Sequence, residues 1–267
     1  MERATYTHGH HESVLRSHGR RTAENSAAYL LPHLRPGLSL LDVGAGPGSI
    51  TLDLARSVAP GLVTGVDVAP AAVARARDAA DAAGLSAVTF AVADVFALPY
   101  GDGAFDVVHA HQVLQHLHDP VAALREMRRV VTPDGVVAVR DVDYGGTVWG
   151  PPSEGLDLWL RVYRAVHRGN GGEPDAGRRL RSWCLGAGFG EVTSSASIWS
   201  FAEDDERAWW ADAWAVRATE SDFARQAVDG GHATSADLRV VAEAWRTWGD
   251  DPAGTFLMPH AEVLARR

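Results

Sequence analysis

The 267-residue chain contains no lysine, so all 25 of its basic residues are arginines. Without lysine it cannot form a Schiff base or use the tyrosine–lysine pair that serves many nicotinamide-dependent oxidoreductases. It also has a single cysteine, Cys184, which excludes an intrachain disulfide and a cysteine-based zinc cluster. A lone thiol favours a reducing setting, and we therefore expect a cytoplasmic protein.

Long apolar runs are missing as well. No stretch approaches the roughly 20 apolar residues of a membrane span, and the N-terminal residues lack the apolar core of a secretion signal. The formal net charge of −9 would repel a phosphate backbone. We expect a small-molecule partner, with no nucleic acid and no membrane span, and a homodimer stays open.

The most informative segment present runs from Asp42 to Gly48 and reads D-V-G-A-G-P-G. It follows an apolar run and precedes a helical pattern from Ile50, which predicts a strand, a glycine-rich turn and a helix. Glycine lets the backbone approach a ligand, and the helix N-terminus presents free N–H groups. A dinucleotide motif would need a glycine where the chain has Ser49, so this spacing disfavours a nicotinamide cofactor.

Apolar stretches alternate with helical patterns along the first half of the chain. Strands are expected at 38–43, 62–67, 87–93, 105–109 and 136–140, and two further strands at 191–201 and 255–265. This order predicts an α/β fold, a Rossmann-like, doubly wound, mostly parallel sheet with helices on both faces. The single domain, 1–267, would comprise an N-terminal lid (1–36, with a helix from Arg20 to Leu34), a core (37–145) and an acceptor-side region (146–267) with a helical insertion at about 203–252.

Acidic residues follow successive predicted strands. Asp67 lies 19 residues after Gly48, at the end of the second strand, where a carboxylate can accept hydrogen bonds from ribose hydroxyls. Asp94 ends the third strand in the same way. Because ligands bind at the carboxyl ends of parallel strands, these acids are predicted to face a cofactor. Asp67 could also cap the following helix.

The D-x-G-x-G-x-G turn resembles motif I of class I S-adenosylmethionine (SAM)-dependent methyltransferases. The stretch F-D-V-V-H-A-H-Q-V-L-Q-H-L-H-D-P at 105–120 resembles the ubiquinone- and menaquinone-biosynthesis-type branch, as do R-T-A-E-N-S-A-A-Y-L at 21–30 and G-A-G-F at 186–189. The resemblance implies a seven-stranded Rossmann-like sheet, SAM as cofactor with S-adenosylhomocysteine as product, and a small-molecule acceptor, which we expect to be apolar or aromatic.

Family membership also implies which residues contact SAM. In the family, the acid of the third strand accepts from the adenine amino group, the next backbone N–H reaches a ring nitrogen, and residues after the fourth strand contact the methionine part. Carried onto this chain, the predicted cofactor contacts are Asp42, Gly44, Ala45, Gly46, Gly48, Asp67, Val68, Asp94, Val95, Ala110, His111 and Gln112.

SAM brings an already activated methyl group, so the protein has to align the acceptor and exclude water. A hydroxyl acceptor would benefit from a general base, and His111 and His116 are the candidates. Alternatively, His116 orders its loop. No metal is expected: the N-terminal histidine cluster is better explained as a lid, and the acids of magnesium-dependent methyltransferases are absent after the fourth strand. This cluster comprises Tyr6, His8, His10, His11 and His18.

Six of the nine tryptophans lie between Trp199 and Trp248. Their helical spacing places them either in a core or along an apolar acceptor pocket. Two other functions stay open, an NAD(P)-dependent oxidoreductase on a Rossmann fold and a SAM-binding protein without methyl transfer.

Overall fold

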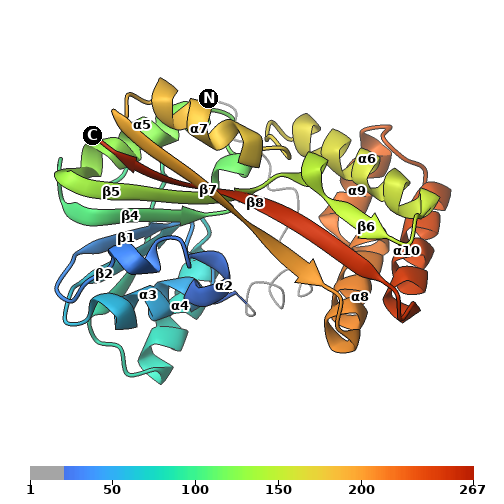
Figure 1. The fold of residues 1–267 in the computed structure, drawn as a ribbon, viewed down its shortest axis with the longest axis horizontal. Helices are drawn as coiled ribbons and strands as arrows, with labels where there is room; N and C mark the ends of the chain where they lie inside the picture. The colour runs from blue at the N-terminus through green and yellow to red at the C-terminus, as the bar shows by residue number, and fades with distance from the viewer. Residues whose placement is uncertain (1–20) are drawn as a thin grey trace.

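The computed structural model describes residues 21–267, and the predicted N-terminal histidine cluster lies outside them. Its centre is an eight-stranded sheet with the order β3-β2-β1-β4-β5-β8-β6, and β7 pairs with β8 (Figure 1). The strands are β1 (Leu40–Val43), β2 (Val63–Asp67), β3 (Val88–Val92), β4 (Phe105–His111), β5 (Val131–Val142), β6 (Val148–Gly150), β7 (Glu191–Phe201) and β8 (Thr255–Arg266).

The first five strands form a parallel sheet with helices on both faces. Apolar residues of β1 and β2 pack against α3 (Ser49–Val58) and α4 (Pro70–Ala82). Those of β4 and β5 pack against α5 (Pro120–Val130) and α7 (Leu180–Gly186). A parallel sheet covered on both sides confirms the predicted Rossmann-like fold, and it brings the carboxyl ends of β1 to β5 to one edge.

Beyond β5 the sheet turns antiparallel through β8 and β7. These two long strands cross from the parallel sheet to a separate helical lobe (Figure 1). The lobe contains α6 (Glu154–Gly169), α8 (Asp204–Glu220), α9 (Asp222–Asp229) and α10 (Ser235–Asp250). The expected late strands and the helical insertion between them are therefore present, while β6 is a short strand that the sequence pattern did not indicate.

The tryptophans of the lobe form its core. Trp159, Trp214 and Trp245 are completely buried, and the Trp159 ring lies 4.8 Å and 4.9 Å from the other two, edge to face. Trp210 and Trp248 are 5% and 3% exposed in the same cluster. This packing accounts for the helical spacing of these residues. No helix within residues 21–267 combines the length and apolar character needed to cross a membrane.

The continuous N-terminal helix expected from Arg20 to Leu34 is wrong. The structure has one turn, α2 (Ala23–Ser26), and a separate 3-10 turn, η1 (Leu31–His33). A capping box between Thr22 and Asn25 starts α2. α2 ends at Ser26 because Ala27 leaves the helical region, with φ −139° and ψ 19°. Pro32, which has no N–H to donate, lies in the first turn of η1. The interruption lets this segment fold back over the sheet, where α2 contacts α3.

Candidate active site

The glycine-rich turn joins β1 to α3 and adopts a left-handed backbone at all three of its glycines. The φ angles of Gly44, Gly46 and Gly48 are 69°, 55° and 88°. A Cβ atom on Gly44 would lie 2.4 Å from Cγ2 of Val113, so a side chain cannot be accommodated there. The backbone N–H groups of Gly44 and Ala45 both donate to the carbonyl of Val66. The turn is thereby fixed at the end of β2, close to the start of the segment after β4.

Asp42 is enclosed beneath this turn and is 3% exposed. One carboxylate oxygen accepts from the hydroxyl of Thr51 at 2.5 Å, and the other accepts from Nδ1 of His109 at 2.7 Å. Asp42 therefore joins β1 to the first turn of α3 and to β4. In this arrangement its contribution to a ligand would come through the shape of the turn.

Asp67 is positioned at the end of β2 by two backbone groups. Its Oδ2 accepts from the N–H of Gly46 at 3.0 Å, and its Oδ1 accepts from the N–H of Ala69 at 2.9 Å. Each oxygen keeps a further lone pair for a ligand hydroxyl. Val68, the next residue, is 56% exposed, so an apolar side chain stands uncovered beside this carboxylate.

The predicted residues of β3 and β4 face different environments. Asp94 accepts from the N–H of Phe96 at 3.0 Å, while the side chain of Val95 is buried against α5. Ala110 is 1% exposed and points into the same α5-side core, so only its backbone faces the strand ends. His111, at the next position of β4, lies on the opposite face of the sheet.

Gln112 connects three parts of the chain at the end of β4. It has a φ of 53°, a left-handed conformation that is costly for a residue with a side chain. Its Oε1 accepts from Arg21 at 2.9 Å, and its Nε2 lies 2.8 Å from Nε2 of His260 on β8. Nδ1 of His260 donates to the carbonyl of Met258, so its Nε2 must accept from the glutamine.

A row of polar residues, buried except for Ser195 at its end, crosses the sheet beside Gln112, and sequence reasoning missed it. His111 pairs with Arg140 on β5, Arg140 with Glu262 on β8, and Glu262 with Ser195 on β7. The Arg140 guanidinium lies 3.3 Å from the Glu262 carboxylate, which also accepts from Ser195 at 2.8 Å. Polar residues at inward-facing positions of an otherwise apolar strand were the available signal.

His111, Arg140 and Glu262 of this row, and His260 beside it, are shielded from water. Burial lowers the pKa of Arg140 to about 10, and it holds the pKa values of His111 and His260 well below the usual range. Burial also raises the pKa of Tyr29 well above its ordinary value. Both histidines are consequently neutral, and interactions here are stronger than in solvent.

Trp199 on β7 covers the row. Its ring lies 5.0 Å from the Arg140 guanidinium carbon and 5.6 Å from that of Arg21. Its indole N–H donates to the carbonyl of Asn25 at 2.8 Å, which fastens α2 against β7. An aromatic ring beside a buried, polar strand edge is the kind of surface that can contact a small ligand.

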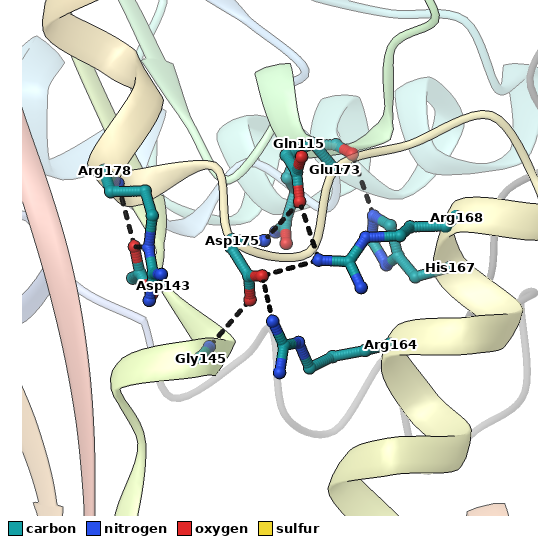
Figure 2. Close-up of polar contacts among 9 residues, drawn as sticks. All are labelled: Gln115, Asp143, Gly145, Arg164, His167, Arg168, Glu173, Asp175 and Arg178. Atoms are coloured by element: carbon teal, nitrogen blue, oxygen red, sulfur yellow. Dashed lines mark hydrogen bonds and ion pairs between the residues drawn. The ribbon is translucent and has the colours of Figure 1, made fainter.

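The turn after β4 is held against the helical lobe by a second network. His167 on α6 donates from Nε2 to the carbonyl of Gln115 at 2.8 Å, as Figure 2 shows. Its Nδ1 accepts from the hydroxyl of Tyr163. Burial lowers the pKa of His167 to about 4, so it is neutral. The His116 ring stacks on His167 with centroids 5.0 Å apart. Asp141 on β5 accepts a hydrogen bond from the backbone N–H of Gln115.

Ion pairs in Figure 2 fix the loop that precedes α7. Asp175 accepts from Arg164 and Arg168 of α6 and from the N–H of Gly145 after β5. Arg178 pairs with Asp143 at 2.6 Å. This loop therefore links the end of β5 to α6 and supports the strand edge. Within residues 21–267, no group of three or more His, Cys, Asp or Glu residues is arranged to hold a metal ion.

Comparisons with known proteins agree with this geometry. A family model described as a methyltransferase domain matches residues 34–163. An uncharacterised methyltransferase of Schizosaccharomyces pombe is 32% identical over 98% of this chain and 96% of its own length. A demethylmenaquinone methyltransferase of Thermus thermophilus is 39% identical over 46% of this chain and 53% of its own length.

A solved structure, the YcgJ protein of Bacillus subtilis, aligns with a TM-score of 0.62 at 20% identity, covering 91% of this chain and 99% of that one. That likeness shows a shared fold. The match of the fission yeast relative along nearly the whole chain shows the family. The chain therefore belongs to the class I SAM-dependent methyltransferases, with S-adenosylmethionine as its cofactor.

Proposed function

We propose that this protein transfers the methyl group of SAM to a small, apolar or aromatic acceptor in the cytoplasm. The observation that carries the proposal is the cradle formed by the three left-handed glycines and by Asp67, whose carboxylate is bonded to the N–H of Gly46. It lies at the carboxyl ends of the parallel strands, where ligands of such sheets bind.

The residues of the cradle suit SAM in chemistry and in position. The carboxylate of Asp67 would accept from the ribose hydroxyls, and exposed Val68 would contact the adenine. Asp94 and Val95 would hold the edge of the adenine, while Ala110, His111 and Gln112 would face the methionine part. Asp42, Gly44, Ala45, Gly46 and Gly48 would shape the turn around the cofactor. When bound, SAM supplies a sulfonium-activated methyl group.

The acceptor would lie beside the end of β4, next to His111 and Trp199. His111 is 6% exposed there, and its ring lies 5.7 Å from the Trp199 ring between centroids. We propose that His111 touches the acceptor. His116 stacks on His167 at the neighbouring turn, and its role as a base or acceptor contact stays a prediction. The absence of a nucleic-acid partner and the option of a homodimer also stay predictions.

Calorimetric titration with S-adenosylhomocysteine tests the cofactor site. Micromolar binding is expected for the wild type, with at least a tenfold loss in Asp67→Ala because two ribose hydrogen bonds are removed. Asp81→Ala, which changes an exposed aspartate on α4, serves as the matched control and should bind normally. Binding of NADH in place of S-adenosylhomocysteine would overturn the proposal.

Methyl transfer from labelled SAM then tests the acceptor class. Label should enter the small-molecule fraction when cell extracts are supplied as acceptors. Label found only in protein or nucleic acid would contradict a small-molecule acceptor. Tight cofactor binding without any transfer would instead favour the non-catalytic alternative.

A further inference from the structure

His111 carries a hydrogen-bonding atom that has no partner among residues 21–267. The residue is 6% exposed, and its Nε2 atom is buried and unbonded there. Its other ring nitrogen, Nδ1, lies 3.5 Å from a guanidinium nitrogen of Arg140. Arginine can only donate, so Nδ1 must present its lone pair to Arg140. The hydrogen of the neutral imidazole consequently sits on Nε2.

Protonation of this ring is opposed from several sides. Burial lowers the pKa of His111 well below its usual value, and the charges of Arg21 and Arg140 lower it further. A second ring hydrogen would also point at the Arg140 guanidinium. Nε2 is thus a fixed donor, and Nδ1 is unavailable to a ligand.

The two neighbouring histidines are less suited to a ligand. His260 has both ring nitrogens engaged, one by Gln112 and one by the carbonyl of Met258. His109 also has a buried Nε2 without a partner among the described residues, but it is 0% exposed and lies two residues earlier on β4, away from the strand end. His111 stands at the last position of β4, 5.7 Å from the Trp199 ring between centroids. Its neighbour Ala110 pairs with Val43, immediately before the glycine turn.

We propose that the Nε2–H of His111 donates a hydrogen bond to an oxygen of the methyl acceptor, and that the acceptor is a phenol or enol methylated on that oxygen or on a conjugated carbon, not an amine. The proposal rests on the proposed methyltransferase function and narrows its substrate class.

The number of lone pairs on the acceptor atom distinguishes a phenol or enol from an amine. The phenol or enol gives its proton to bulk solvent before it binds, and the oxyanion that binds has lone pairs to spare. One lone pair accepts from His111 while another forms the new oxygen–carbon bond, and the bond between the methyl carbon and the sulfur breaks as the new bond forms. For methylation on carbon, the ring carbon forms the bond, and the product gives up the proton of that carbon to bulk solvent after release. A neutral amine has one lone pair, which cannot accept from His111 and attack at once.

This role of His111 therefore differs from that of a general base, which was the role predicted from the sequence. It orients the acceptor oxygen and stabilises its negative charge, as preorganised donors do in other enzymes. Its Nδ1 lone pair faces Arg140 and takes no part in removing a proton.

Nitrogen NMR of ¹⁵N-histidine-labelled protein, saturated with S-adenosylhomocysteine at neutral pH, tests the tautomer directly. The His111 signals, assigned by their loss in His111→Phe, should show hydrogen on Nε2 only. His33→Gln removes an exposed histidine on η1 and is the assignment control. Hydrogen on Nδ1, or on both nitrogens, would overturn the proposal.

Binding of naphthol and of naphthylamine with the same substitution pattern tests the acceptor class on the same cofactor-saturated protein. Wild type should bind naphthol about 10- to 100-fold more tightly, the value of a hydrogen bond to a charged oxygen. His111→Phe should lose this preference, and His111→Gln, whose amide can still donate, should recover part of it. Equal affinities of the wild type for naphthol and naphthylamine, or a preference for naphthol that survives in His111→Phe, would refute the proposed acceptor class. Failure of S-adenosylhomocysteine to bind would instead refute the proposed function.

Discussion

Residues on one face of β8 belong to two different regions, the apolar core of the helical lobe and the polar row. Phe256 and Met258, near its start, are 0% and 1% exposed within the aromatic core of the helical lobe. His260 and Glu262, two and four residues farther on the same face, are 0% and 5% exposed in the polar row at the strand ends. The two stretches are equally buried, yet one is entirely apolar and the other polar and charged.

Burial of apolar rings needs no partner beyond close packing, whereas a buried polar group is costly unless it is hydrogen-bonded. Apart from Nε2 of His111, the polar row satisfies this requirement through cross-strand contacts of Arg140, Glu262 and two serines. Breaks in local hydrophobic patterning are typical of functional sites. The contrast along β8 therefore separates the part of the molecule that stabilises the lobe from the part that we propose contacts a ligand.

The largest effect is expected in the aromatic core. Trp159→Ala should lower the free energy of unfolding by about 3–5 kcal/mol, because a fully buried ring with neighbours on several helices is lost. Denaturant unfolding would measure it. Leu185→Ala, which changes a side chain that is 50% exposed, should stay within about 0.5 kcal/mol. If folded Trp159→Ala binds S-adenosylhomocysteine much more weakly than wild type, the two regions are not separable.

The polar row should respond differently to single and double changes. Glu262→Leu should cost about 3 kcal/mol, since it leaves the charge of Arg140 buried without its carboxylate. The double variant Arg140→Leu, Glu262→Leu should recover most of this stability, because an apolar pair can replace a buried ion pair. Denaturant unfolding of both variants is the measurement. A double variant no more stable than the single one would mean that the row is not a compensated charge pair.

The smallest effect concerns the junction between the two regions. The pKa of His167 is about 4 in the folded protein, below its ordinary 6.5. Between these values the unfolded chain binds a proton that the folded protein does not, so stability falls as the pH is lowered. The contribution is about 2 kcal/mol between pH 7 and pH 5.

His167→Gln keeps a donor for the carbonyl of Gln115 but cannot titrate. Unfolding free energies measured from pH 7 to pH 5 should fall less steeply in this variant than in the wild type. Because the other titrating groups, including Asp141 with its pKa raised to about 8, occur in both proteins, the difference isolates His167. Parallel curves would show that His167 does not hold the junction in its neutral form.

Much of the parallel sheet was predictable from local patterns. Strands followed by turn residues and helices gave β1 to β5, and glycine spacing placed the cradle at Gly44 to Gly48. The expected N-terminal helix was wrong, because α2 ends after one turn at Ser26 and a separate 3-10 turn that contains Pro32 follows. The polar row was not predicted either, because its members come from four strands that are distant in the chain.

The sequence by itself determined the fold class, the position of the glycine turn and Asp67 beside it, since these depend on local spacing and on where parallel strands end. Only the tertiary structure decided that Arg140, Glu262 and His260 meet next to His111, because strand pairing across β8 brings them together. It also decided which nitrogen of His111 is available. That choice depends on an arginine 29 residues away, which can donate hydrogen bonds but cannot accept them.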